Sequence, residues 1–553
     1  MNKNLRINPL RIIALVLGVV LAFCGCCATE SGSEVSSAPI VSGSGNLPQG
    51  SITLAYTAND SLDPYTAMTK TNQELCGLLF DGLVVLDDSF TPHYRLAGDI
   101  QNDGTVVTVT LANALFSDGS KVTAADVVAS LEAARAAEHL SYAADFENVK
   151  EVAVTENGLV QLTLHHQDPY FVNFLDFPIF KEGSREVENN DNKPLPPIGS
   201  GRFVYHEEGD RYWLTANPKW IGGRVAIPHA ELTNMPDQEA ISHAASVGRV
   251  DWCYADLSNN QFPNMNGVSR TVNLPNLVYL GANMRSGVMS IQEVRLGVST
   301  ALDRQNIAQT AYFDMATPAK GPLPDGVEAA SGLQSLSPLA DTAAATEWFG
   351  KAGFATRTPD GFCSNGELTL SVQVIYNSDN TARQSIANLL QTSLQNAGCR
   401  VELKGLSFED YCNAIKWGNY DIYIGEMAIP DNFDLYRLLT AGGLIPLYGQ
   451  EAEEEEDEEE EEEQNEDSDP SQDVPSGQDP SAEPEVLSAA TAVSRYHNGK
   501  GSLTEVLSQV GEQLPIIPLC FRRGMLVYTA KLKGDPAPLW GDPFYGIEHC
   551  TVQ

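Results

Sequence analysis

Residues 75–131 constrain the fold of this chain most, because strand and helix signals follow one another there within a short distance. Residues 106–111 alternate in a period of two and are rich in Val and Thr, which predicts a β-strand. The turn pair Asp103-Gly104 opens this strand, and a second turn pair, Asp118-Gly119, follows it. The segment therefore predicts a hairpin with tight turns at both ends of the strand.

A capped helix is predicted directly after this hairpin. Thr123 can act as the N-cap through its hydroxyl group, and Asp126 can reach back to it in a variant of the capping box. The predicted helix covers residues 127–134. A strand followed by a capped helix indicates an α/β chain.

The first residues predict export from the cytoplasm. Three basic residues precede an apolar run at 12–23, which is too short to span a bilayer by itself and is typical of a secretory signal. The run ends before Gly25 and Cys26, and this ending resembles a lipoprotein signal, in which the cysteine becomes the lipidated first residue of the mature chain. Cys26 fits best, with Cys24 and Cys27 as alternatives, and a signal peptide cut elsewhere is the remaining alternative. The predicted signal peptide covers residues 1–26.

Residues 27–49 follow as a predicted flexible tether, because they are rich in Ser, Gly and Pro. About 500 residues remain, and a chain of that size predicts at least two lobes. The seven cysteines outside the N-terminal segment show no CxxC spacing and are expected to be small buried hydrophobes. They are Cys76, Cys253, Cys363, Cys399, Cys412, Cys520 and Cys550.

The formal net charge of −39 comes in large part from one segment. Residues 451–485 contain no Lys or Arg, and 453–463 are almost entirely carboxylates. Glutamates at this density repel one another and leave nothing apolar to bury, so we expect a disordered, solvated acidic insertion at 450–486. Carboxylates without turn geometry make no specific calcium site, and nucleic acid is not expected as a partner.

Residues 75–131 also resemble the N-terminal signature of the extracellular solute-binding proteins of peptide and nickel ABC importers, solute-binding family 5. In that signature a helix, a GLV-LD strand, an aspartate-glycine turn, an alternating strand, FSDG and TA-DV follow in this order. The resemblance continues from residue 52 to 532, apart from the acidic insertion. Further matching segments are residues 198–203, 216–220, 241–252, 279–283, 294–295, 301–304, 317–324, 347–353 and 513–519.

The resemblance implies an α/β, two-lobed periplasmic-binding-protein-like fold of type II, with an extra subdomain in the first lobe. Its lobes would enclose a ligand when they close about the hinge. The implied boundaries are lobe 1 at 50–280 with a subdomain at about 84–195, lobe 2 at 281–508, and a return to lobe 1 at 509–553.

An enzyme is not expected. The sequence contains no GxSxG, no HExxH, no P-loop and no GxGxxG after a strand. The one adjacent histidine pair, His165-His166, is predicted to lie on an alternating strand, where the two side chains point to opposite faces. We therefore expect no catalytic residues, no cofactor and no metal site.

The candidate ligand-binding residues come from the resemblance and from strand ends. Peptide-binding members carry an aspartate that pairs with the ligand's amino terminus, and Ile429 stands at that position here. Asp431 or Asp434 can substitute after a shift, and Glu426 offers another carboxylate, since a buried amino group without a carboxylate is costly.

The ends of strands face the crevice in α/β folds, which adds candidates there. The backbone at 426–428 could pair with an extended ligand as an added strand. Each of these residues has an ordinary hinge or turn role as the alternative. The added candidates are Asn59, Asp63, Tyr65, Asn283, Met284, Met427 and Ala428.

The resemblance thus implies a lipid-anchored substrate-binding protein on the extracytoplasmic face of the cell membrane. It would capture a peptide or another small solute and deliver it to ABC permease and ATPase subunits, and it is expected to be a monomer. The departure at Ile429 and the acidic insertion motivate an alternative, a surface receptor or sensor with the same fold and no transport partner.

Overall fold

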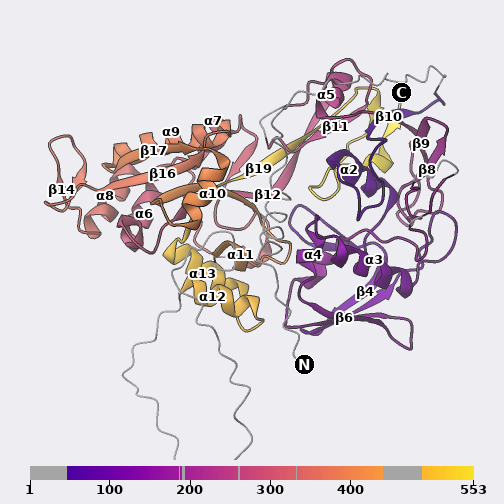
Figure 1. Cartoon of the computed structure of the whole chain (residues 1–553), viewed down its shortest axis with the longest axis horizontal. Coiled ribbons are helices and arrows are strands. Elements are labelled where there is room, and N and C mark those ends of the chain that lie inside the picture. The colour runs from indigo at the N-terminus through magenta and orange to yellow at the C-terminus, as the bar shows by residue number, and fades with distance from the viewer. Residues whose placement is uncertain (1–46, 186, 190–193, 259–261, 332, 440–487) are drawn as a thin grey trace, which may run out of the picture. The chain divides into compact units, whose positions relative to one another are not determined.

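The computed structural model describes residues 47–185, 187–189, 194–258, 262–331, 333–439 and 488–553. The predicted signal peptide, the acidic insertion and all but the end of the predicted tether lie outside the described residues. The described residues form two compact units (Figure 1). Unit 1 contains the residues up to Pro275 together with Pro430–Asn432 and Arg522–Gln553, and unit 2 contains Asn276–Ile429 and Phe433–Phe521.

Unit 1 contains a four-stranded sheet in the order β1, β10, β9, β8. β1 and β10 are parallel, and the other neighbours are antiparallel. Ile52, Leu54 and Tyr56 are buried at alternate positions of β1, so one face of this strand contacts the core. The strands are β1 (Ile52–Tyr56), β8 (Phe203–Glu208), β9 (Arg211–Ala216) and β10 (His229–Asn234).

A second, antiparallel sheet of unit 1 contains the predicted hairpin, in the order β4, β5, β7, β6. The predicted strand at 106–111 is β5 (Val106–Leu111), which confirms the prediction. The amide of Asp103 donates to Val106 O at 2.9 Å, and Gly104 has φ +85°, as the turn requires. The other strands of this sheet are β4 (Ala97–Asn102), β6 (Val149–Val154) and β7 (Val160–Leu164). The pair His165-His166 follows β7 instead of lying on it, because the pairing of this strand ends at Leu164.

The predicted capped helix is α3 (Ala124–Ala136), which extends past the predicted ends on both sides. The Asp126 carboxylate accepts hydrogen bonds from the Thr123 amide at 2.7 Å and the Thr123 hydroxyl at 2.6 Å, so the capping prediction is confirmed. Asp126 also accepts from the Glu182 amide at 2.7 Å, which ties a distant loop to the start of α3.

The remaining elements of unit 1 are short. Its helices are α2 (Lys70–Leu79), α4 (Tyr142–Asp145), α5 (Gln238–Ser246), η1 (Phe171–Asp176) and η4 (Ile547–His549). Its other strands are β2 (Val84–Leu86), β3 (Pro92–Tyr94), β11 (Trp252–Ala255), β20 (Leu532–Lys533) and β21 (Thr551–Val552).

The glycine-rich segment at 198–203 packs against the end of α2. The Gly201 amide donates to Leu79 O at 2.9 Å. A Cβ on Gly201 would lie 2.4 Å from the carbonyl carbon of Leu79, and one on Gly199 would lie 2.0 Å from Leu79 O. These contacts are to backbone atoms, so only glycine allows the approach.

Arg202 follows these glycines and joins the C-terminal segment to unit 1. Its side chain is 3% exposed and forms an ion pair with Asp542. Its Nε lies 3.6 Å from Oε2 of Glu548. Burial works against the charged form, but Asp542 and Glu548 raise the pKa of Arg202.

Unit 2 is built on a sheet in the order β19, β12, β18, β16, β17. β16 is parallel to β17 and β18, and β12 is antiparallel to β18. The strands of this sheet are β12 (Val268–Ala282), β16 (Ser371–Asn377), β17 (Arg400–Leu406), β18 (Ile422–Ala428) and β19 (Ile516–Tyr528), and β13 (Ala316–Pro318) pairs with β19. A separate pair of short strands is formed by β14 (Thr356–Arg357) and β15 (Cys363–Ser364).

Helix α9 (Thr381–Ala397) contributes much of the core of unit 2. Its Ile386, Leu390 and Leu394 are fully buried against the sheet, as expected for one face of an amphipathic helix. The other helices are α6 (Gln292–Ala301), α7 (Arg304–Ala311), α8 (Thr342–Lys351), α10 (Phe408–Lys416), α11 (Tyr436–Leu439), α12 (Ala489–His497), α13 (Leu503–Gln513), η2 (Val288–Ser290) and η3 (Glu328–Ala330).

The chain passes from unit 1 to unit 2 within the long strand β12 and returns to unit 1 within the long strand β19. The sequence placed the return to lobe 1 at residue 509, which falls inside α13. Val506, Leu507 and Val510 of this helix are buried, and the whole helix packs in unit 2 against α12. The return therefore lies after Phe521, and the first crossing lies after Pro275.

All seven cysteines outside the N-terminal segment are free thiols, and all but Cys412 are buried. Their expected role as small buried hydrophobes holds for these six. Among the helices that the structure describes, none combines the length and the hydropathy needed to cross a membrane.

Candidate functional site

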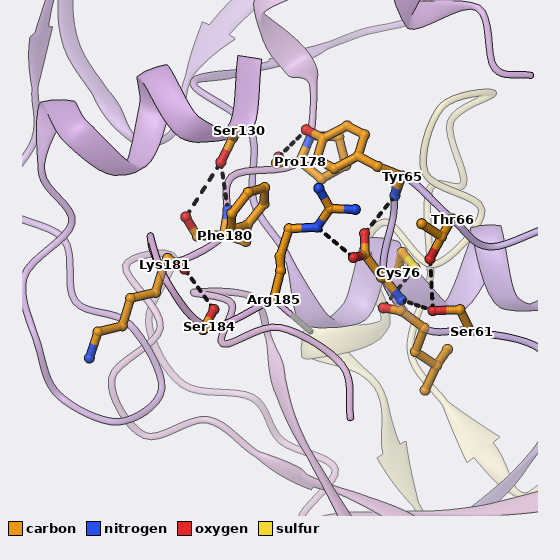
Figure 2. Close-up of polar contacts among 12 residues, drawn as sticks. Ser61, Tyr65, Thr66, Cys76, Ser130, Pro178, Phe180, Lys181, Ser184 and Arg185 are labelled. Carbon is orange, nitrogen blue, oxygen red and sulfur yellow. Dashed lines mark hydrogen bonds and ion pairs between the residues drawn. The ribbon is translucent and has the colours of Figure 1, made fainter. Parts of the chain in front are cut away.

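Asp63 and Tyr65, two of the predicted ligand-binding residues, are buried and paired within unit 1. The Asp63 carboxylate accepts from Nε of Arg185 at 2.6 Å and from the Tyr65 amide at 2.9 Å. The Tyr65 hydroxyl donates to Pro178 O at 2.5 Å (Figure 2). The polar groups of both residues are therefore used within the fold. Asn59, the neighbouring candidate, is exposed.

The segment Pro430–Asn432 belongs to unit 1, although the chain on both sides of it belongs to unit 2. Nδ2 of Asn173 donates to Asp431 O at 2.8 Å, and Nδ2 of Asn432 donates to Oδ2 of Asp168 at 2.8 Å. Asn173 and Asp168 are themselves buried. These bonds fix the backbone, while the Asp431 carboxylate has no hydrogen-bond partner among the described residues.

Three carboxylates of unit 1 form what we call the acidic cluster, namely Asp145 in α4, Asp176 at the end of η1, and Asp431. All three are half-buried. Burial and the neighbouring Asp176 and Asp145 raise the pKa of Asp431 well above its usual range. Burial and the neighbouring Asp145 raise the pKa of Asp176. Within the described parts of the chain, no cation pairs with Asp176 or Asp431, so a positive group that entered the cluster would stabilise both carboxylates.

Two tyrosines connect the acidic cluster to the Asp63–Arg185 pair. The rings of Tyr65 and Tyr142 meet edge to face with centroids 5.7 Å apart. Burial and the Asp176 carboxylate raise the pKa of Tyr142, so its phenol stays protonated. The acidic cluster and Arg185 therefore lie in one region of unit 1.

Glu426, a candidate in unit 2, is already neutralised by the fold. It forms an ion pair with Arg383, and its Oε1 accepts from Nδ2 of Asn276 at 3.0 Å. Nη1 of Arg383 donates to the Tyr312 hydroxyl at 2.8 Å. Burial opposes the charged guanidinium, but Tyr312 and Glu426 raise the pKa of Arg383. Glu426 thus belongs to an ion pair that holds β18 to α9.

The other candidates of unit 2 lie at opposite ends of β18. Asn283 follows Ala282, which pairs with Ile422, whereas Ala428 pairs with Asn276. Six residues of strand, at about 3.4 Å each, separate these ends by about 20 Å. Asn283 donates from Nδ2 to Gly418 O at 3.1 Å and Tyr420 O at 2.9 Å, and Met284 packs on the core. The structure therefore does not bring Asn283 and Met284 together with residues 426–428.

Met427 and Ala428 lie past the pairing between β16 and β18, which is registered at Ile422 and Tyr423. Both residues pair with β12 on the other side. The added ligand strand at this edge stays a prediction.

Asp434 and Asp431 differ in what they contact. Asp434 accepts from the Tyr436 amide at 2.9 Å, and its Oδ2 lies 2.6 Å from Nδ1 of His497. Ile429 is 2% exposed and belongs to the apolar interior. Of the two aspartates that can replace the family's aspartate, only Asp431 joins the acidic cluster.

Tyr142, Asp145, Asp176 and Arg185 were missed by the sequence reasoning, because they lie on short elements and loops of unit 1 without a local motif. Tyr142, Asp145 and Asp176 are brought together only by their meeting with Asp431, and Arg185 is placed near them by the Tyr65 ring. Within the described residues, no group of three or more His, Cys, Asp or Glu side chains has the geometry to hold a metal ion.

These features define a solute-binding protein built from two α/β units. The family model described as "Bacterial extracellular solute-binding proteins, family 5 Middle" matches residues 90–442, more than half of the 553 residues, and the chain belongs to this family. Family 5 proteins are the solute-binding components of ABC importers for peptides or nickel and are not enzymes. The family predicted from the sequence is thereby confirmed.

Curated relatives and solved structures agree with this family. The chain is 22% identical over 455 residues to the oligopeptide-binding protein AppA of Bacillus subtilis, covering 77% of this chain and 81% of that one. It is 26% identical over 328 residues to the glutathione-binding protein GsiB of Salmonella choleraesuis, covering 55% of this chain and 60% of that one.

An ABC transporter substrate-binding protein from Sinorhizobium meliloti shares the fold, with a TM-score of 0.69 at 17% identity. The match covers 91% of this chain and 100% of that structure. The predicted two-lobed periplasmic-binding-protein-like fold is confirmed by this likeness.

Proposed function

We propose that this protein is a lipid-anchored, extracytoplasmic substrate-binding subunit of an ABC importer. Its ligand would be a peptide or another small solute that carries a primary amine. The acidic cluster of unit 1 is the observation that carries this proposal, because Asp176 and Asp431 have no cation partner among the described residues.

Charge supports an amine as the group that enters the cluster. Half-buried carboxylates are costly to ionise without a positive partner, and an ammonium group offers three donors and a full positive charge. The proteins to which this chain is similar bind, by their names, oligopeptides and glutathione, and both ligands carry such an amine. Asp431 lies two residues after Ile429 and would supply the carboxylate that this position lacks.

Calorimetry on the full-length protein in detergent tests the amine. The probes are a mixture of random di- and tripeptides and the same mixture with acetylated amino termini. We expect the free mixture to bind and Asp431→Asn to weaken it by about tenfold to a hundredfold, because a charge-assisted hydrogen bond is lost.

Glu156→Gln is the matched control, since this exposed glutamate follows β6 and lies in a turn. It should bind as the unchanged protein does. Equal binding of the acetylated mixture would show that the cluster does not recognise an amine.

The anchor and the delivery step are tested in cells. Residue Cys26 lies outside the described part of the chain, and the short apolar run before it supports its lipidation. Cys26→Ser should release the protein from membranes, whereas Cys24→Ser should not. Deleting the gene should abolish uptake of a bound peptide, and unchanged uptake would favour the receptor without a transport partner.

A further inference from the structure

Arg185 is held in one orientation by three neighbours in unit 1. Its Nε donates to Oδ2 of Asp63 at 2.6 Å, and the two side chains are 27% and 12% exposed. Its guanidinium carbon lies 5.8 Å from the centre of the Tyr65 ring and 5.4 Å from that of the Phe180 ring. Figure 2 shows the guanidinium between these rings.

The terminal nitrogens of Arg185 are the part of this side chain that the fold does not use. A guanidinium carries five N–H donors, and only the one on Nε has a partner among the described residues. Two buried arginines use both terminal nitrogens: Nη1 and Nη2 of Arg304 donate to residues 299 and 337, and those of Arg383 donate to Tyr312 and Glu426. Arg185 is therefore fixed at one end while four donors stay available at the other.

Asp63 makes this orientation rigid. Its amide donates to Oγ of Ser61 at 2.9 Å, and its Oδ1 accepts from the Tyr65 amide at 2.9 Å. The Tyr65 hydroxyl is held by Pro178 O at 2.5 Å. We call the terminal N–H groups of Arg185 the fork. Because the guanidinium is already fixed, the fork loses little conformational entropy when it binds a ligand.

A carboxylate is the anion that fits this fork. Two terminal N–H groups of a guanidinium match the two oxygens of a carboxylate in a bidentate pair. A phosphate carries more negative charge than a carboxylate, so the nearby carboxylates of the acidic cluster would repel it more strongly. The single positive charge of Arg185 thus favours a monoanion.

We propose that Arg185 binds the carboxylate of the ligand through Nη1 and Nη2, and that the ligand is a short zwitterion. This rests on the proposed function, in which the acidic cluster binds the amine. Arg185 and Tyr142 both contact the buried ring of Tyr65, each at less than 6 Å, so the guanidinium lies near the acidic cluster. At about 3.5 Å per residue, an extended tripeptide has a length comparable to these two contacts together.

The test compares peptide mixtures that differ at one end only. Full-length protein is mixed with random di- and tripeptides as free acids, as C-terminal amides, or with acetylated amino termini. Retained peptides are identified by mass spectrometry, and affinities are measured by calorimetry. We expect the free acids to be retained and the amides to bind about tenfold to a hundredfold more weakly.

Two variants separate recognition from folding. Arg185→Lys keeps a positive charge beside Asp63 but removes the fork, and it should weaken the free acids while leaving the amides unchanged. The double change Arg185→Gln with Asp63→Asn leaves no unpaired buried carboxylate and should show the same loss. Lys181→Gln is the control, because Lys181 lies in the same loop and pairs with Asp118.

The outcomes distinguish this proposal from the one on which it rests. Equal binding of acids and amides, or unchanged binding by Arg185→Lys, would overturn the role of Arg185 and leave the amine site standing. Equal binding of acetylated and free peptides would overturn the amine site. Retention of no short peptide in either form would overturn both.

Discussion

Replacing Arg202 should destabilise unit 1 strongly. The Arg202 side chain is 3% exposed, and its partners Asp542 and Glu548 are 15% and 6% exposed. Arg202→Met would leave both carboxylates buried without their cation. Removing one partner of a buried ion pair costs about 3–5 kcal/mol, a large part of the 5–15 kcal/mol that stabilises a typical domain.

Calorimetric melting and urea unfolding measure this loss. For a unit of this size, about 2–4 °C per kcal/mol predicts that Tm falls by roughly 6–20 °C. Arg270→Met is the control, because Arg270 also pairs with the C-terminal segment, at Asp535, but these side chains are 37% and 81% exposed. An exposed pair contributes about 0–1 kcal/mol, so this control should lower Tm by a few degrees at most.

The double change Arg202→Met with Asp542→Asn should recover part of the stability, since one buried charge is then removed. A loss for Arg202→Met that is no larger than the loss for Arg270→Met would refute the reasoning. It would show that water reaches the pair or that the C-terminal segment is held by other contacts.

Three further predictions follow from the same physical arguments. Peptide affinity should rise from about pH 5 to about pH 8, because burial and Asp145 raise the pKa of Asp176 and a proton competes with the ligand's amine. The rise should be shallower in Asp176→Asn, in which burial and Asp145 still raise the pKa of Asp431. Glu74→Gln should raise Tm at pH 8 but not at pH 5. Burial, opposed by Lys70, raises the pKa of Glu74 from 4.5 to about 8, so the folded state loses stability as the pH rises between these values and Glu74 must ionise. A neutral glutamine avoids this loss. Gly201→Ala should cost about 1–3 kcal/mol in urea unfolding, because its Cβ would meet backbone 2.4 Å away, whereas Gly350→Ala in α8, with open space around it, should not destabilise.

Local structure could be read from the sequence because it depends on near neighbours. The alternation at 106–111 gave β5, and the pairing of Thr123 with Asp126 gave the start of α3, since both signals act within a few residues. The order of family segments likewise identified the family and the class of fold without any contact being known.

The candidate site was only partly predictable. Asp431 was named together with Asp434, and no local signal separates two aspartates three residues apart. Their partners decide between them, because Asp434 contacts His497 in unit 2 whereas Asp431 joins the acidic cluster in unit 1. Asp63 and Tyr65 were named as ligand contacts, yet the structure uses their polar groups to hold Arg185 and Pro178.

The sequence by itself thus determined the class of protein, its α/β elements and its departure from the family at Ile429. The tertiary structure alone decided which carboxylates meet, because Asp145, Asp176 and Asp431 come from segments far apart in the chain. It also separated Asn283 from Glu426, which the antiparallel register of β12 and β18 keeps at a distance. Burial and the charges of distant residues set the pKa of a side chain, and neither quantity is present in a local pattern of residues.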